Sequence, residues 1–169
     1  MFLKYLCNLW MALNEENNMS KHHDADLILK LYELRREKTM REARNWFFQF
    51  NPKGKEDFID VLTSDKSGLY RMVVSYWDMA CSFVNNGALD AQMFNDANGE
   101  HMFVYAKLEP FLPALREEMG NPNFLAHLEK VVKECPDYET KIANIRTRMA
   151  KLIELYQQRA AAQAAAAGN

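Results

Sequence analysis

The residues that could do chemistry in this sequence are its histidines, its cysteines and a few charged side chains. Helical bundles often perform catalysis with two carboxylate-bridged metal ions, and such a site requires Glu-x-x-His on two helices. The residues three positions before His22, His23, His101 and His127 are Met19, Ser20, Asn98 and Phe124. None of them is a glutamate, so the sequence argues against a di-metal centre. The motifs of zinc proteases, serine hydrolases and phosphate-binding loops are also missing from the sequence.

The remaining nucleophile is a cysteine within an apolar stretch. Cys81 could form a thiolate pair with His101 or His127. The simpler interpretation is an uncharged, buried cysteine and ordinary surface histidines. The adjacent His22 and His23 could hold a metal ion weakly, but they lie in a polar linker. We therefore predict a protein that is not an enzyme, with no catalytic residue, cofactor or metal.

Three charged residues on predicted core elements are candidates for a polar cleft: Arg71, Asp78 and Arg116. A lone carboxylate in a core is costly, so a buried Asp78 needs a partner. Because Arg71 lies about two turns away on the same helix, we expect Arg116 to be that partner. The cleft could bind a small anion or a partner's side chain. Alternatively, these residues form a solvated strip at the edge of the bundle.

The element that positions these residues is a predicted central helix at Ser67–Asn86. Between Leu69 and Val84 the polar residues are Arg71, Ser75, Asp78 and Ser82. Their spacing of four, three and four places them on one narrow strip, since a helix turns by about 100° per residue. A helix that is apolar on its other sides belongs inside a core. We therefore predict an all-α, multi-helix bundle of six to eight helices around this segment.

The other elements follow from local signals. A change in phase of the apolar residues predicts two helices, or one bent helix, with the join near Lys38-Thr39. Between Lys30 and Arg44 lie six basic and three acidic residues, which indicate a solvated helix face or a modest basic patch. Pro110 and Pro113 predict a kink or break in the helix at 100–119.

The expected domain organisation has three parts. Residues 1–23 form an apolar segment followed by a polar linker, 24–158 a single helical domain, and 159–169 an alanine-rich tail. Residues 1–13 are too short to span a bilayer, which needs about 20 apolar residues. They could instead dock on the bundle or anchor the protein at a membrane surface. The apolar residues of such an anchor would be Phe2, Leu6, Leu9, Trp10 and Leu13. Translation could also begin at Met19.

The last helix has the clearest apolar repeat. Its members are Tyr138, Ile142, Ile145, Met149, Leu152 and Tyr156. The steps alternate between four and three residues, which is typical of a coiled-coil seam. This seam could dock on the parent bundle or pair with a second copy of the chain.

Composition limits the partners and the compartment. The net charge of −2 provides no overall positive field, so we expect no nucleic-acid partner. The three cysteines are odd in number and include no Cys-x-x-Cys pair, which is typical of a protein of the reducing cytoplasm.

Residues 69–132 resemble an uncharacterised bacterial family of short, all-helical proteins. The resemblance rests on the aromatic helix that ends at Asn85-Asn86-Gly87, the segment Pro110 to Arg116, and the turn Asn121-Pro122-Asn123-Phe124 before a helix with Glu129. Residues 32–36, Tyr-Glu-Leu-Arg-Arg, extend it. The resemblance implies an all-helical fold and no particular activity.

The sequence leaves three functional hypotheses. The first is a non-enzymatic protein-interaction or regulatory module with an unknown protein partner, which could self-associate through the seam at 138–156. The second is a peripheral membrane protein that uses residues 1–13. The third is a helical bundle that binds a small ligand.

Overall fold

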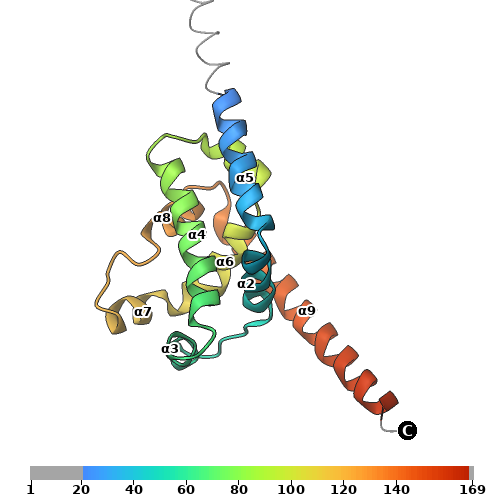
Figure 1. The fold of residues 1–169 in the computed structure, drawn as a ribbon. Helices are drawn as coiled ribbons and strands as arrows, with labels where there is room; N and C mark the ends of the chain where they lie inside the picture. The colour runs from blue at the N-terminus through green and yellow to red at the C-terminus, as the bar shows by residue number, and fades with distance from the viewer. Residues whose placement is uncertain (1–20, 168–169) are drawn as a thin grey trace, which may run out of the picture.

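The protein is all-α. The structure is a computed structural model that describes the backbone of residues 21–167 and the side chains of residues 21–163 (Figure 1). Its helices are residues 21–36, α2 (Lys38–Gln49), α3 (Lys55–Thr63), α4 (Ser67–Asn85), α5 (Ala91–Ala97), α6 (Glu100–Leu108), the 3₁₀ turn η1 (Glu109–Phe111), α7 (Leu112–Glu118), α8 (Ala126–Lys133) and α9 (Tyr138–Ala167). The described residues contain no strand. The predicted fold class is confirmed.

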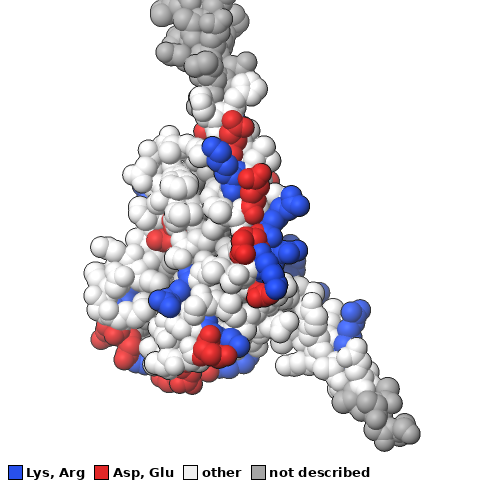
Figure 2. Space-filling model, in the orientation of Figure 1, with Lys and Arg blue, Asp and Glu red and all other residues white. Residues whose placement is uncertain are grey.

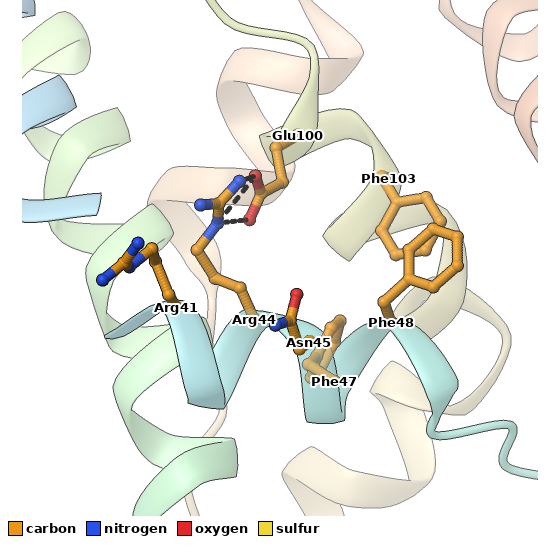
Figure 3. A pocket seen from close by; sticks show the side chains of 7 residues that line it. All are labelled: Arg41, Arg44, Asn45, Phe47, Phe48, Glu100 and Phe103. Atoms are coloured by element: carbon orange, nitrogen blue, oxygen red, sulfur yellow. Dashed lines mark hydrogen bonds and ion pairs between the residues drawn. The ribbon is translucent and has the colours of Figure 1, made fainter. Parts of the chain in front are cut away.

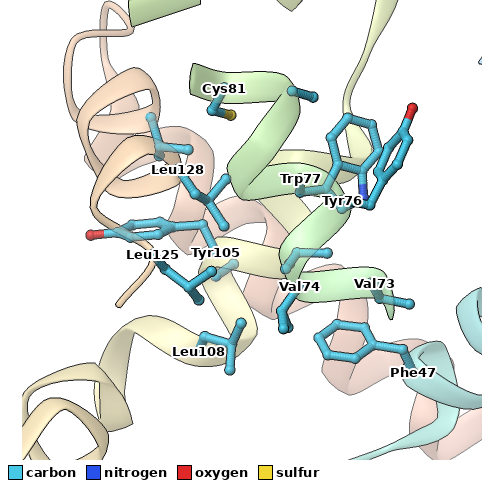
Figure 4. Close-up of a cluster of buried hydrophobic side chains, with 14 of the residues drawn as sticks. Phe47, Val73, Val74, Tyr76, Trp77, Cys81, Tyr105, Leu108, Leu125 and Leu128 are labelled. Carbon is cyan, nitrogen blue, oxygen red and sulfur yellow. The ribbon is translucent and has the colours of Figure 1, made fainter. Parts of the chain in front are cut away.

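Helix α4 lies inside the bundle, as its sequence predicts. It packs mainly against α2 and α8, with further contacts to α3 and α6. Its buried residues are Tyr70, Val73, Val74, Tyr76, Trp77, Ala80 and Cys81, and most of them form the cluster in Figure 4. The exposed strip is wider than the polar residues indicate, because Met72 and Met79 also face solvent. The helix ends before Gly87, whose positive φ of 71° suits a residue without a Cβ.

Helix α6 is as enclosed as α4, although its sequence does not single it out. It contacts α4, α8 and α9, and its buried residues are His101, Val104, Tyr105, Ala106, Lys107 and Leu108. The chain then leaves the α-helical path at η1, where Pro110 occupies the first turn, and resumes as α7 with Pro113 near its start. The predicted break at the two prolines is thus confirmed.

The first two described helices also meet where the apolar phase changes. Residue 37 separates the helix at 21–36 from α2, and the Glu37 carboxylate accepts a hydrogen bond from the backbone N–H of Met40 at 2.9 Å. Tyr76 of α4 donates its hydroxyl to the carbonyl oxygen of Leu31 at 2.7 Å. This buried bond fixes the first helix against the core.

Helix α9 divides into two parts with different surroundings. Residues 138–149 pack on α6 and α8 and contribute Ile142 and Ile145 to the core. Residues 150–167 extend away from the body (Figure 1). The helix continues through the alanine-rich segment as far as Ala167, where the sequence indicates a tail.

The amino-terminal hypotheses concern residues outside the described part of the chain. Neither the apolar anchor within residues 1–13 nor the alternative start at Met19 is tested by the structure. Among the described residues, no helix has both the length and the apolar character needed to cross a bilayer.

Candidate functional site

The three residues expected to form a polar cleft do not meet. Asp78 accepts a hydrogen bond from the backbone N–H of Leu128 at 2.9 Å. Arg116 instead pairs with Glu129 at 2.6 Å and donates to the carbonyl oxygen of Phe124 at 3.0 Å. Arg71 is exposed, and its Nε reaches only the carbonyl of Ser67 in its own helix. The expected pair of Asp78 with Arg116 was therefore wrong.

The bond made by Asp78 explains how a carboxylate is accommodated on α4. Helix α8 begins after Leu125, which has a left-handed φ of 56° and provides no side-chain cap. The first N–H groups of a helix need acceptors and attract negative charge. Asp78 supplies this cap from a neighbouring helix, so its role here is to hold α8 against α4.

Arg116, on α7, belongs to a second structural group. This group joins α7 to the turn before α8 and to α8 itself. Glu129 accepts hydrogen bonds from Arg116 and from Lys133, both at 2.6 Å. Burial raises the pKa of Glu129, but these two cations outweigh that effect and hold the pKa below its usual value. Glu129 therefore stays ionised at neutral pH. Arg116, which it holds in place, anchors the turn at 121–125 through the carbonyl oxygen of Phe124.

The described surface has a different hollow, between α2 and α6, of about 440 Å³. Its lining residues are Arg41, Arg44, Asn45, Phe47, Phe48, Glu100 and Phe103. Figure 3 shows Glu100 and Arg44 at one side, Phe48 and Phe103 at the other, and Asn45 between them. This volume lies within the range of small-molecule sites, roughly 300–1,000 Å³. The hollow therefore combines a charged side with an aromatic side.

An ion cluster builds the charged side. The Glu100 carboxylate accepts hydrogen bonds from Arg44 Nε at 2.7 Å and from Arg35 at 2.8 Å. Arg35 also donates to Asn98 and lies over the ring of Trp77, 5.1 Å from its centroid. Burial raises the pKa of Glu100, but the hydrogen bonds and charges of the two arginines lower this pKa by more than burial raises it. The carboxylate therefore stays ionised. The cluster ties the first helix and α2 to α6.

The aromatic side is a stacked pair that also touches α9. The rings of Phe48 and Phe103 are 5.3 Å apart and nearly parallel, with an interplanar angle of 7°. Tyr156 meets Phe48 edge-on at 6.3 Å. Beyond this contact lies a second hollow of about 430 Å³ between the end of α2 and α9. It is lined by Phe48, Gln49, Asn51, Ile153, Tyr156, Gln157 and Ala160.

Buried Lys107, on α6, fixes the end of α2 that carries Phe48. Its ammonium donates to the carbonyl oxygens of Phe47, Phe48 and Phe50 at 2.6, 3.1 and 2.5 Å. It also lies over the rings of Phe47 and Phe103. Burial lowers the pKa of Lys107 to about 7, whereas three carbonyl acceptors match the three donors of the ammonium form. Lys107 therefore caps the carboxyl end of α2.

The predicted seam of α9 is only partly covered. Ile142 and Ile145 are buried, with 3% and 9% exposure, and Tyr138 and Met149 pack against the core. In contrast, Leu152 is 39% exposed and Tyr156 is 57% exposed. Leu155, on the same side, is 52% exposed. We call Leu152, Leu155 and Tyr156 the outer face of α9; the projecting part of this helix is mostly uncharged in the view of Figure 2.

The cysteine and the histidines considered for nucleophilic chemistry are buried in the core or bonded to neighbouring residues. Burial raises the pKa of the Cys81 thiol, which opposes thiolate formation, and His127 instead contacts Asn85 at 3.2 Å. His101 is fully buried between Trp77 and Phe94. Within the described part of the chain, no three His, Cys, Asp or Glu residues gather as metal ligands.

Sequence reasoning missed the ion cluster and the aromatic pair. It treated Lys30–Arg44 as a solvated face or a basic patch, and Figure 2 does show acidic and basic residues interleaved along this part of the surface. Arg35 and Arg44 nevertheless turn towards Glu100, which is 65 and 56 positions away. No local spacing in the sequence indicates such a distant pairing.

Comparison with known proteins gives a family and no activity. No curated protein and no solved structure matches this sequence. Residues 21–135 match a family described as a domain of unknown function, DUF4760. This range includes the ion cluster, the hollow between α2 and α6, and Asp78, and it ends before α9. The chain belongs to this uncharacterised DUF4760 family.

Proposed function

We propose that the protein is a non-enzymatic interaction module that self-associates through the outer face of α9. One observation carries this proposal. The apolar repeat of α9 is covered by the protein's own core at Ile142 and Ile145, and it continues unchanged into the exposed Leu152 and Tyr156. A coiled-coil repeat that extends beyond the helices covering it within its own chain is suited to pairing with a second chain.

The shape of the projecting helix favours a second copy as that partner. Residues 150–167 extend over about 27 Å, at 1.5 Å per residue. Two such helices crossing in antiparallel fashion would cover Leu152, Leu155 and Tyr156 on both chains, in a two-fold contact. Ala160 and Ala162 lie further along the same side of the helix, at i+4 from Tyr156 and i+7 from Leu155, and their small side chains let two helix backbones approach closely.

The size of this contact sets the expected strength of association. A standard stable interface buries about 800 Å² on each partner, and one pair of short helices covers less. The hollow beside Phe48 and Asn51 adds area that the partner's helix could fill. We therefore expect a reversible dimer with a dissociation constant of roughly 1–100 μM, which corresponds to about −8 to −5.5 kcal/mol.

Sedimentation velocity over a wide range of protein concentration tests the proposal. The wild-type mass is expected to rise from monomer to dimer. The double variant Leu152→Asp plus Leu155→Asp is expected to remain monomeric, because it places carboxylates in the contact. Ala143→Asp plus Ala150→Asp makes the same change in charge at exposed positions on the opposite side of α9 and is expected to dimerise normally.

The design separates loss of association from loss of folding. Both Leu152 and Leu155 are exposed, so circular dichroism and the melting temperature of the diluted double variant should match those of the control. A wild-type chain that stays monomeric at all concentrations would reject self-association. Equal loss of dimer in both double variants would show that charge, and not the outer face, controls it.

A further inference from the structure

We propose that the hollow between α2 and α6 binds a small aromatic carboxylate. The site consists of Arg41, Arg44 and Asn45 on α2, and of the stacked ring pair formed by Phe48 and Phe103. This inference goes beyond the proposed self-association and does not depend on it.

The charges around the hollow favour an anion. Arg41 and Arg44 contribute two positive charges, and Glu100 contributes one negative charge that is already shared between Arg44 and Arg35. The side chain of Arg41 forms no ion pair or hydrogen bond with any described residue. A net positive lining with one uncommitted guanidinium is suited to a carboxylate.

Arg44 is held in place for this role. Its Nε and one terminal nitrogen bond to Glu100, and its other terminal nitrogen reaches the carbonyl of Arg35 at 3.4 Å. A guanidinium has five N–H donors, so donors remain on both terminal nitrogens. A donor already fixed by its neighbours loses little conformational freedom when a ligand arrives.

Asn45 and the ring pair set the shape of the ligand. Asn45 lies between the arginines and the phenylalanines (Figure 3) and has an amide that can donate to a carboxylate. Phe48 is one turn further along α2, and its ring stacks with Phe103. From Arg41 to Phe48 the helix rises by about 10 Å. A flat aromatic ring with a carboxylate at one end fits this sequence of groups.

The rigid mounting of the ring pair supports a preformed site. Lys107 binds the last carbonyl groups of α2 and lies over the rings of Phe47 and Phe103. The backbone that carries Phe48 is therefore fixed from inside the protein. A ring face that is held in position and partly exposed gives a ligand a surface against which it can pack without first ordering a loop.

Isothermal titration and two-dimensional NMR of the full chain with 2-naphthoate test the proposal. The neutral 2-naphthamide and the saturated decahydro-2-naphthoate, which keeps both rings without the aromatic faces, are the matched probes. We expect 2-naphthoate to bind about fivefold or more tightly than either one, with shifted amide signals at residues 41–48 and 100–103. Equal binding of the three probes, or no binding of 2-naphthoate at millimolar concentration, would overturn the proposal.

Two variants locate the site. Asn45→Asp keeps the shape of the side chain and adds a negative charge, so binding of 2-naphthoate should weaken about fivefold or more. Asn144→Asp makes the same change on the exposed surface of α9 and should bind normally. Arg41→Gln should also weaken binding while leaving the melting temperature unchanged, because Arg41 is exposed and without a partner in the described structure. Equal affinity of Asn45→Asp and Asn144→Asp would place any binding elsewhere.

Discussion

The two halves of α9 carry the same apolar spacing and reach opposite outcomes. Residues 138–149 lie on α6 and α8 and bury Ile142 and Ile145. Residues 150–167 continue the helix without cover for Leu152 and Leu155. The difference shows that a coiled-coil repeat defines an apolar helix face but does not determine which partner covers that face. Here the cover within the chain ends after Met149.

The end of the docked half is marked by a polar contact as well as by packing. Arg146 donates its Nε to the carbonyl oxygen of Ala106 at 3.1 Å and pairs with Glu109. Both acceptors lie at the end of α6 and the start of η1. Three residues later, Met149 makes the last contact of the seam with the core. Beyond it, the outer face begins.

The largest expected effect comes from placing the same charge on each half. Ile142→Asp should lower the free energy of unfolding by about 4 kcal/mol, because an unpaired carboxylate would enter the core. Leu155→Asp should change it by less than about 0.5 kcal/mol, because that side chain is exposed. Urea titrations at a concentration where the chain is monomeric measure both values. Similar losses in the two variants would abolish the distinction between the halves.

The next effect is a pH dependence at the helix that receives the docked half. The ring of His101 on α6 is fully buried between Trp77 and Phe94. Burial, with a smaller contribution from the charge of Arg35, lowers the pKa of His101 from 6.5 to about 4. The unfolded chain therefore binds a proton in this pH range before the folded chain does. Stability is present above pH 6.5 and is lost as the pH falls towards 4, by about 3 kcal/mol in total.

Urea unfolding of His101→Phe as a function of pH isolates this contribution. The variant keeps an aromatic ring beside Trp77 and Phe94 and removes the titrating group, so it should lose the pH dependence between about 6.5 and 5. Below that range, carboxylates such as Glu100 add their own acid sensitivity, since the pKa of Glu100 is lowered in the fold. His127→Gln removes an exposed histidine and should keep the wild-type slope. An unchanged slope in His101→Phe would contradict the assignment.

The smallest expected effect lies at the one ring contact that bridges the body and the outer face. Phe48 and Tyr156 meet edge-on, and such pairs couple by about 0.5–1.5 kcal/mol. Because both rings are partly exposed, a double-mutant cycle to alanine should give a value near the lower end. The cycle of Phe48 with Leu155 should give no coupling. Coupling of equal size in both cycles would show that the projecting half responds as a whole and not through this contact.

Local signals predicted the fold well where one residue type has one physical consequence. The thin polar strip at Arg71–Ser82 placed α4 in the core, and Pro110 ended α6 because proline cannot donate within a helix. The sites were harder to predict. The expected partner of Asp78 was an arginine, whereas the structure gives it a helix amino terminus. Both neutralise a carboxylate, and the sequence alone does not distinguish them.

By itself, the sequence determined most of the helical segments, the break at the prolines and which faces are apolar, because these properties depend on residues within a few positions of each other; it did not indicate that α9 continues through the alanine-rich segment to Ala167. Only the tertiary structure decided which side chains share a site. Glu100 pairs with Arg35 and Arg44, and Lys107 binds the end of α2. Helix α9 extends beyond the helices that cover its first half. Each outcome depends on how whole helices are placed in space. Long-range ion pairs and capping bonds have no fixed spacing in a sequence, since any helix that brings a suitable donor within reach can supply the partner.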